Sequence, residues 1–280
     1  MLGIGLALAA SLAWGFGDFV SGSKTRVLPV LVVLVCSQLV GLAWIAAVAL
    51  IAQEPAPGAR EIAFAALSAL AGTAGLACFF RAIAVGKMSL VVPIAATAAA
   101  LPVVVGIATG DRPSALQIAG MVVALAGVVM ASREPDEEGA RGSRLAAGVL
   151  LAALSAFFIG WFFLAIDVAS DGGAVWASLV NRITSVTLLV TAALFVRPPL
   201  RDARPHVPAL ALAGTLDVSA NVLFAAASTK GLVSLVSVAG SLYPVITVLL
   251  ARVVLHERVH RVQEAGVVAA LAGVVLIAAG

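Results

Sequence analysis

The segments DRPSALQIAGMVVALAGVVM (residues 111–130) and ERVHRVQEAGVVAALAGVVL (residues 257–276) lie 146 positions apart and are identical at eleven of twenty positions. Alanine and valine are frequent throughout the chain, so their identity carries little information. The informative matches are an acid followed by arginine, a glutamine six residues after the acid, and glycines nine and sixteen residues after it. This shared spacing of rarer residues indicates an internal duplication.

The composition indicates a protein whose surface faces lipid. The chain is 62% hydrophobic and 11% charged, against about 25% charged residues in ordinary globular domains. A soluble fold of 280 residues cannot bury that much apolar surface. The net charge of only +3, without a basic patch beyond short loops, argues against a nucleic-acid partner.

Ten segments have the length and hydropathy of membrane-spanning helices, which need about 20 apolar residues to cross the hydrocarbon. The breaks between them carry Gly, Pro and charged residues, as in "AQEPAPGARE" and "RPPLRDARPH". Backbone groups in lipid must be bonded internally, so the spans are predicted to be helices. The ten segments are approximately 2–20, 27–51, 61–84, 88–109, 114–131, 145–166, 174–196, 207–229, 232–254 and 262–279.

The duplication divides the chain into two five-helix repeats, 1–131 and 145–280, joined by a charged linker, 132–144. A shift of 145 residues extends the repeat through each half and aligns the pairs Gly3–Gly148, Gly15–Gly160 and Phe79–Phe224. Because five is odd, the second repeat must enter the membrane from the opposite side. We therefore expect an all-α integral membrane fold of ten helices in two inverted repeats, an arrangement recurrent in secondary transporters.

The residues that carry this pattern resemble a known family. "LAWG" at 12–15 and the motif [DE]R-x4-Q-x2-G-x6-G-V that closes each half are similar to the EamA-type branch of the drug/metabolite transporter superfamily. The resemblance covers essentially the whole chain, and relatives move amino acids, drugs, sugars and other metabolites. This sequence departs from the family at Asp18, where relatives often carry a basic residue, and at Ala98, which stands where the second repeat has Pro244.

The resemblance implies a secondary active transporter, an exporter or exchanger of small metabolites such as amino acids or amphiphilic drugs, with alternating access around a central cavity. It also implies a multi-pass protein of the cell membrane, in a bacterium the inner or plasma membrane. The chain lacks a GxxxxGK[ST] phosphate loop, so ATP is not expected as the direct fuel. Neither a cofactor nor a metal site is expected, because Cys36 and Cys78 are isolated in apolar runs.

Two other classes of function stay open at this stage. A passive channel or a non-transporting membrane scaffold would share the same hydropathy pattern. A membrane-embedded enzyme would need a convergent catalytic set on facing helices, and the three histidines lie in or beside loops at positions 206, 256 and 260.

Ionisable residues within the spans are the leading functional candidates, because an uncompensated charge at the bilayer centre costs roughly 2.5–3.5 kcal/mol or more. Arg182 and Asp217 lie in the middle of the seventh and eighth spans, and Asn221 shares a helical face with Asp217. They are expected either to line a substrate cavity, with Asp217 carrying a proton, or to form a structural ion pair.

Four candidates in the first repeat and its counterpart have open alternatives. Asp18 is a second proton-coupling candidate or reaches interfacial water, and Arg81 meets a substrate carboxylate or snorkels to the headgroups. Trp14 and Trp161 lie at similar positions in the two halves and either flank a ligand or anchor at the interface. Gln38, in mid-span, is expected to form an interhelical hydrogen bond.

The fourth and ninth spans begin alike, with hydroxyl residues on one face. Thr97, Ser241 and Tyr243 are candidate substrate contacts, although the hydroxyls can instead bond to the preceding helical turn. Pro244, next to Tyr243, is expected to free a backbone carbonyl and let the helix bend.

The repeated motif itself is interpreted as a packing element. Gly120 and Gly127 lie on one face of the fifth span, where small residues permit close helix approach in lipid. Asp111 and Glu257 are expected to stabilise the start of the helix that follows each of them. The fifth and tenth helices are expected to brace the cavity or to form a homodimer contact.

The distribution of basic residues predicts the membrane orientation. Eleven of the 17 Lys and Arg lie in the loops 21–26, 85–87, 132–144, 197–206 and 255–261, and three lie in the loops of the other side. The positive-inside rule places the first set in the cytoplasm and both termini outside. The family resemblance implies the reverse, with both termini in the cytoplasm.

Overall fold

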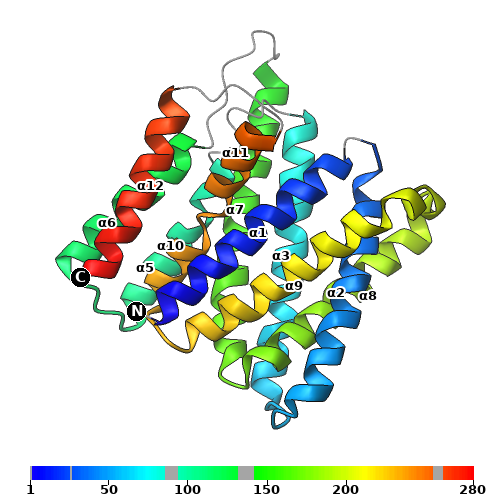
Figure 1. Cartoon of the computed structure of the whole chain (residues 1–280), viewed down its shortest axis with the longest axis horizontal. Coiled ribbons are helices and arrows are strands. Elements are labelled where there is room, and N and C mark those ends of the chain that lie inside the picture. The colour runs from blue at the N-terminus through cyan, green and yellow to red at the C-terminus, as the bar shows by residue number, and fades with distance from the viewer. Residues whose placement is uncertain (1, 26, 86–93, 132–141, 255–260) are drawn as a thin grey trace.

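The computed structural model describes residues 2–25, 27–85, 94–131, 142–254 and 261–280 (Figure 1), and every regular element in these ranges is helical. Seven helices are long and apolar enough to cross a membrane, and three shorter apolar helices accompany them. The elements are α1 (Leu2–Thr25), α2 (Val30–Ala52), α3 (Ala59–Val85), η1 (Ala96–Ala99), α5 (Ala100–Thr109), α6 (Ala115–Ala131), α7 (Gly142–Ser170), α8 (Ala174–Val196), η2 (Leu200–His206), α9 (Val207–Ser228), α10 (Val233–Gly240), α11 (Tyr243–Val254) and α12 (Arg261–Ala279).

Residues with left-handed backbone angles, prolines and glycines mark the ends of several helices. α2 and α8 end at Ala52 and Val196. The residues that follow, Gln53 and Arg197, have left-handed φ angles of 47° and 51°, which turn the chain out of the helix. Each is followed by prolines, which cannot continue a helix. Gly173, which directly precedes α8, has a φ of 104°, a backbone conformation that glycine adopts readily and other residues rarely do. Outside the fourth and ninth spans the predicted boundaries agree closely, except that α1 extends to Thr25 and α7 begins at Gly142, within the predicted linker, and extends to Ser170.

The fourth and ninth spans are not continuous helices, so the expected number of ten spans is not established. α10 ends at Gly240 and α11 begins at Tyr243. Pro244 has no N–H to donate to the Gly240 carbonyl, and its ring clashes with that carbonyl in an α-helix. In the first half, a 3₁₀ turn at 96–99 precedes α5. Residues 88–93 of the expected fourth span lie outside the described residues, as does most of the linker 132–144.

Helices of the two halves pack against each other. α1 packs on α9, and α3 packs on α7, so the first helix of each half lies against the third helix of the other. The second helices, α2 and α8, pack on each other, and so do the last helices, α6 and α12. Figure 1 shows the α6–α12 pair at one end of the molecule and the α2–α8 pair at the other. The halves are therefore interlocked along their whole length.

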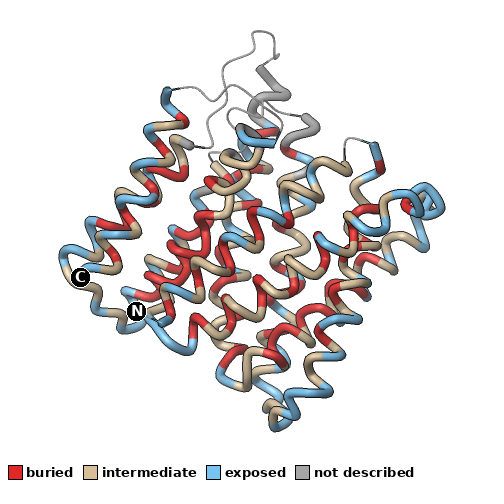
Figure 2. Tube along the Cα trace, viewed as in Figure 1, coloured by how far each residue is buried: buried red, intermediate tan, exposed pale blue. Residues whose placement is uncertain are grey.

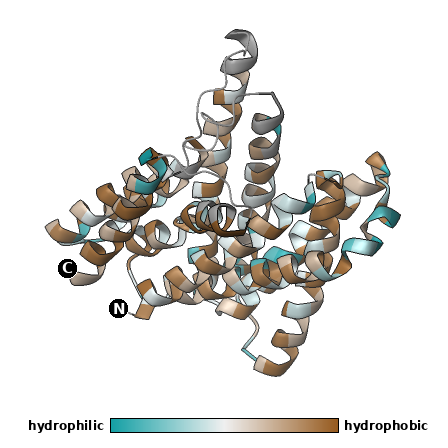
Figure 3. Ribbon diagram, turned by 45° about the horizontal axis from the view of Figure 1, so that its top comes forward, coloured by the Kyte–Doolittle hydropathy of each residue, from teal (hydrophilic) through white to brown (hydrophobic). Residues whose placement is uncertain are grey.

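Apolar residues cover both the interior and the outer surface. A buried cluster around Ala7, Trp14, Phe163 and Phe224 occupies the centre, and Figure 2 shows buried residues on the inner sides of the helices. Large apolar side chains such as Phe195, 84% exposed, face outward, and Figure 3 shows hydrophobic residues along most helices. Such extensive apolar exposure is expected of a surface in contact with lipid.

The glycines of the repeated motif bring α6 and α12 into backbone contact. A Cβ on Gly120 would lie 2.8 Å from the Gly273 carbonyl oxygen, and one on Gly127 would lie 2.7 Å from that of Gly266. These four glycines are two pairs of equivalent positions in the repeats. The interpretation of the motif as a packing element is therefore confirmed, and its glycine faces are engaged within the chain.

Asp111 has a different role from the one expected. Its carboxylate accepts a hydrogen bond of 3.0 Å from the backbone N–H of Ser234, in the first turn of α10, and thus stabilises a helix of the other half. The next helix, α6, is capped by Ser114 and Gln117, each of which accepts a hydrogen bond from the other's backbone N–H. This reciprocal capping box, and not Asp111, supplies the hydrogen-bonded cap of α6. The equivalent Glu257 lies outside the described residues.

Gly273→Ala is expected to destabilise the protein, because the new Cβ would lie 2.6 Å from the Gly120 carbonyl oxygen. Overpacking of a close contact costs about 1–3 kcal/mol. The measurement is the unfolding midpoint of the purified protein in detergent. Gly5→Ala is the matched control, since nothing lies within 4 Å of its Cβ position. An equal midpoint for the two variants would contradict the close α6–α12 packing.

Candidate functional site

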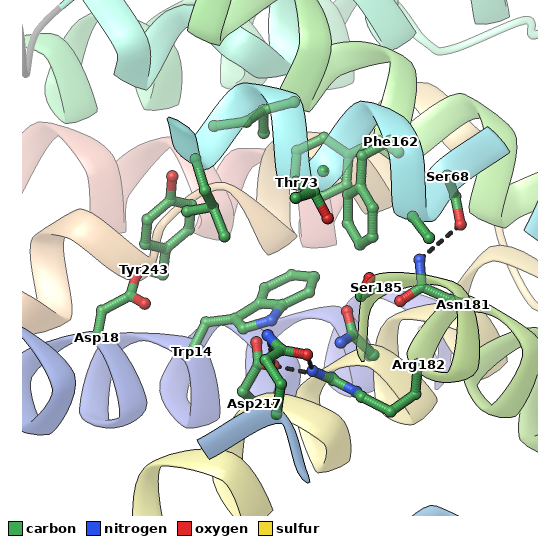
Figure 4. A pocket seen from close by; sticks show the side chains of 17 residues that line it. Trp14, Asp18, Ser68, Thr73, Phe162, Asn181, Arg182, Ser185, Asp217 and Tyr243 are labelled. Atoms are coloured by element: carbon green, nitrogen blue, oxygen red, sulfur yellow. Dashed lines mark hydrogen bonds and ion pairs between the residues drawn. The ribbon is translucent and has the colours of Figure 1, made fainter. Parts of the chain in front are cut away.

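A cavity lies between the two halves (Figure 4). Its walls come from both repeats, with residues of α1, α2 and α3 on one side and of α7, α8, α9 and α11 on the other. About 130 Å³ is accessible to the centre of a water-sized molecule. The lining combines aromatic rings with charged, amide and hydroxyl groups, which is typical of a small-molecule site.

An ion pair with a bridging amide forms the polar wall of this cavity. Arg182 Nη2 lies 2.7 Å from Asp217 Oδ2. Arg182 Nη1 donates to Gln38 Oε1, and Gln38 Nε2 donates to Asp217 Oδ2 at 3.4 Å. The network joins α8, α9 and α2, so the interhelical hydrogen bond expected of Gln38 is confirmed. The Arg182 side chain is 2% exposed and that of Asp217 is 34% exposed, so the carboxylate is the accessible member of the pair.

Glycine at the crossing of α2 and α9 holds this network together. A Cβ on Gly214 would lie 2.8 Å from the Ser37 carbonyl carbon, and one on Gly41 would lie 3.1 Å from the Gly214 carbonyl oxygen. The two helices therefore meet backbone to backbone. This crossing places Gln38, which follows Ser37, beside Asp217, which lies one turn after Gly214.

A second polar contact links the cavity wall to α3. Asn181 Nδ2 donates to Ser68 Oγ at 2.7 Å, and Ser68 Oγ donates to the Ala65 carbonyl oxygen at 2.7 Å. Both side chains are buried and line the cavity. Asn181 was not among the sequence candidates, although an amide next to a mid-span arginine was a usable signal.

Trp14 lies at the centre of an aromatic cluster rather than at a membrane interface. Its ring centroid lies 6.2 Å from Phe162, 6.0 Å from Phe163, 5.6 Å from Phe224 and 6.3 Å from Tyr243. Most of these pairs are edge-to-face, an attractive geometry for aromatic rings. Trp14, Phe162, Phe163 and Tyr243 all line the cavity and provide its apolar surface.

Three further candidates, one each from α1, α9 and α11, also reach the cavity. Asp18, Asn221 and Tyr243 line it. Asn221 is buried and Asp18 is exposed. Figure 4 shows Asp18 and Tyr243 together at one end of the pocket, with Arg182 and Asp217 further along it.

Four candidates do not reach the cavity. Trp161 is 39% exposed, and its ring meets that of Phe157 edge to face. It lies on the opposite face of α7 from Phe163, and Phe162 and Phe163 line the cavity in its place. Thr97 is exposed, and its hydroxyl donates to the Ile94 carbonyl at 2.7 Å.

Ser241 and Arg81 are the other two. Ser241 is buried, and its hydroxyl donates to the Val238 carbonyl at 2.9 Å, so hydrogen bonding to the preceding turn satisfies it. Arg81 is exposed near the end of α3 and is absent from the cavity lining. The helical spacing of hydroxyl residues in the sequence did not distinguish Thr97 and Ser241 from Tyr243, which lines the cavity.

The fold and this polar interior cavity define a multi-pass helical membrane protein with a site built between two repeats. The model of the EamA-like transporter family matches the chain twice, over residues 1–133 and 146–279. The chain therefore belongs to the EamA-like transporter family, a part of the drug/metabolite transporter superfamily.

Solved structures show the same fold. One crystal structure, described only as that of a protein, superposes with a TM-score of 0.80 over 98% of this chain and 95% of its own. The two sequences are 16% identical, so the likeness concerns the fold alone. No curated protein matches this sequence.

Asp217→Asn is expected to lower the free energy of unfolding, because it leaves Arg182 buried without a carboxylate. Removing one partner of a buried pair costs 3–5 kcal/mol, and the partial exposure of Asp217 favours the lower end, about 3 kcal/mol. Unfolding titrations in detergent of Asp217→Asn, Arg182→Leu and the double variant measure the coupling.

The double variant should lose less stability than the two single variants added together. Asp202→Asn, at an exposed site in η2, is the control for loss of a carboxylate. Strictly additive losses would show that the pair does not contribute to stability.

Proposed function

We propose that this protein is a secondary active transporter, an exporter or exchanger, of small metabolites such as amino acids or amphiphilic drugs. The observation that carries the proposal is the polar cavity, with its Arg182–Asp217 pair, enclosed by lipid-facing helices of both halves. Substrate sites of secondary transporters lie at such repeat interfaces, near the middle of the membrane. The energy would come from an ion gradient or from substrate exchange.

The ends of the helices support an inverted arrangement of the repeats. At one end, the start of α1 approaches the α9–α10 turn, where a Cβ on Gly3 would lie 3.0 Å from Lys230. At the other end, Leu28 packs with Ala203 in one cluster, so α1 runs from the first end to the second. α7 finishes at the first end, because a Cβ on Gly172 would lie 2.7 Å from Pro57, in the α2–α3 connection. Opposite directions for equivalent helices are the arrangement of inverted-repeat transporters, in which one repeat moves against the other during alternating access.

The break between α10 and α11, in the predicted ninth span, supports the proposal that part of the cavity wall moves during transport. α10 and α11 meet at Ser241–Leu242, directly before Tyr243 in the cavity wall. A helix interrupted at a proline absorbs changes in backbone angles more easily than a continuous one. Rotation at this break would move Tyr243 relative to Trp14 and change access to the cavity.

Asp217 and Asp18 are the proposed proton-coupling groups. Asp217 accepts from both Arg182 and Gln38, so protonation of its carboxylate would weaken the links between α9 and both α8 and α2. Proton binding would then be coupled to helix movement. A charge that crosses the field contributes about 2.3 kcal/mol per 100 mV, enough to drive accumulation of a substrate.

The alternatives predict different behaviour. A passive channel needs a continuous path, and a scaffold needs no cavity with a buried ion pair. The family supports localisation in a cell membrane, in a bacterium the inner or plasma membrane. The basic loops, and not the family, support an orientation with both termini outside. A homodimer through α6 and α12 would use their outward apolar residues, such as Val122 and Val268, because their glycine faces contact each other.

Transport in proteoliposomes tests the proposal. Thermal-shift screening against amino acids, nucleobases, polyamines and cationic drugs identifies a ligand, since binding to the native state raises stability. Its uptake should be saturable, should show counterflow, and should respond to a pH gradient. Asp217→Asn should reduce the pH-gradient response by about tenfold or more, because the asparagine amide cannot take up and release a proton as a carboxylate does.

Asp202→Asn should transport like the wild type, because its side chain is exposed in η2. A non-saturating, ohmic current would instead identify a channel. Proton coupling that persists in Asp217→Asn would remove Asp217 as the carrier.

The orientation is tested by labelling single cysteines in intact cells, after Cys36 and Cys78 are replaced by alanine. Cysteine at Asp202, on the side with more basic residues, should react with a membrane-impermeant maleimide only after lysis. Cysteine at Lys230, exposed at the opposite end, should react from outside. Efficient external labelling at position 202 would reverse the orientation.

A further inference from the structure

The charges of the cavity wall do not balance. Among the described residues that line it, three side chains are charged in their ordinary state, namely Asp18, Arg182 and Asp217. Two are acids and one is a base, so the described part of the wall carries one excess negative charge. In a cavity whose lining is mostly apolar, an excess charge favours a ligand of the opposite sign.

The basic member is not free to bind a substrate anion. Arg182 is 2% exposed and is held by Asp217 and Gln38. A carboxylate ligand would have to displace Asp217 from its 2.7 Å contact, and the released Asp217 would then add a second negative charge to the wall. The pair therefore disfavours anions.

Asp18 is in the opposite situation. No basic side chain in the described ranges forms an ion pair with it, and it is exposed along the cavity. It lies beside Tyr243, on the same side of the pocket, whereas the Arg182 network lies elsewhere in the wall (Figure 4). An exposed carboxylate in an apolar site has the charge and the geometry to receive an ammonium group.

The aromatic residues that line the same cavity match this ligand, with Tyr243 beside Asp18 and Phe162 further along the pocket (Figure 4). Trp14 and Tyr243 lie with their ring centroids 6.3 Å apart, and Trp14 and Phe162 lie 6.2 Å apart. The negative faces of such rings attract organic cations, by about 0.5–2 kcal/mol each when desolvated. The rings also provide flat apolar surface for the rest of the molecule.

We propose that the cavity selects a small organic cation, with its ammonium group at the Asp18 carboxylate and its apolar part against Trp14, Phe162 and Tyr243. This inference rests on the proposed function only in taking the cavity as the substrate site. It narrows the substrate class from amphiphiles in general to amines, and it ranks zwitterions and anions below them.

Four probes that share a phenyl group and a short chain but differ in charge test the proposal. They are 2-phenylethylamine (cation), phenylalanine (zwitterion), 3-phenylpropanoate (anion) and 3-phenylpropanol (neutral). Isothermal titration of the purified full chain in nanodiscs gives the Kd of each. The cation should bind at least about tenfold more tightly than each of the others, the difference expected from one well-placed charge.

Asp18→Asn, which keeps the shape of the side chain, should weaken binding of the cation by about tenfold or more and leave the neutral probe nearly unchanged. Asp202→Asn, with its exposed site in η2, should preserve the wild-type ranking. If Asp18→Asn cannot be purified, the ranking of the four probes by the wild type still decides the question.

Tighter binding of the zwitterion or the anion, unchanged cation affinity in Asp18→Asn, or no binding of any probe would each overturn the proposal. Failure of the proposed function gives a different result, since cation binding without flux in proteoliposomes would contradict transport alone. Coupled flux of a zwitterion without cation binding would support transport and contradict cation selectivity.

Discussion

The contact between Arg182 and Asp217, with Gln38 across it, is the constraint on which the interior depends. A guanidinium that is almost fully buried in a lipid-facing protein requires a carboxylate, and the carboxylate comes from the neighbouring helix. Gln38 adds the third helix, α2, which can approach only because Gly214 and Gly41 lack side chains. The backbone contact between α2 and α9 places the Gln38 amide beside the Arg182–Asp217 ion pair. The hydrogen bonds of Gln38 to this pair in turn stabilise the contact between the two helices.

The two repeats supply the frame for this interior. Because each half gives its first helix to the third helix of the other, the cavity has walls from both halves and cannot be formed by either alone. The α6–α12 glycine contact provides a second connection, a close backbone approach away from the cavity. A third connection runs from Asp111 of the first half to the start of α10 in the second. Relative movement of the halves would have to preserve the packing at α6 and α12 while the interior changes.

The division of labour among the cavity residues follows from their partners. Arg182 and Asn181 are neighbours on α8, and each is bonded to another helix. They position the wall, and their polar groups are already largely used. Asp18 and the aromatic rings form fewer polar contacts with other helices and line the cavity. The polar groups that rigidify the site are therefore distinct from those proposed to select its ligand.

The sequence by itself determined the membrane class, the helical fold, the repeat and the family, because lipid requires long apolar helices and a duplicated pattern of glycine, glutamine and charge is legible without coordinates. It also identified Arg182 and Asp217, since charges in a span are rare. Only the tertiary structure decided which polar residues meet: that Trp14 lies inside and Trp161 outside, that Asp111 caps a helix of the other half, and that Asn181 and Ser68 form one contact. The physical reason is that apolar residues cover both the lipid-facing and the interior sides of these helices. Periodicity therefore leaves the inward face undefined until the helices pack against each other.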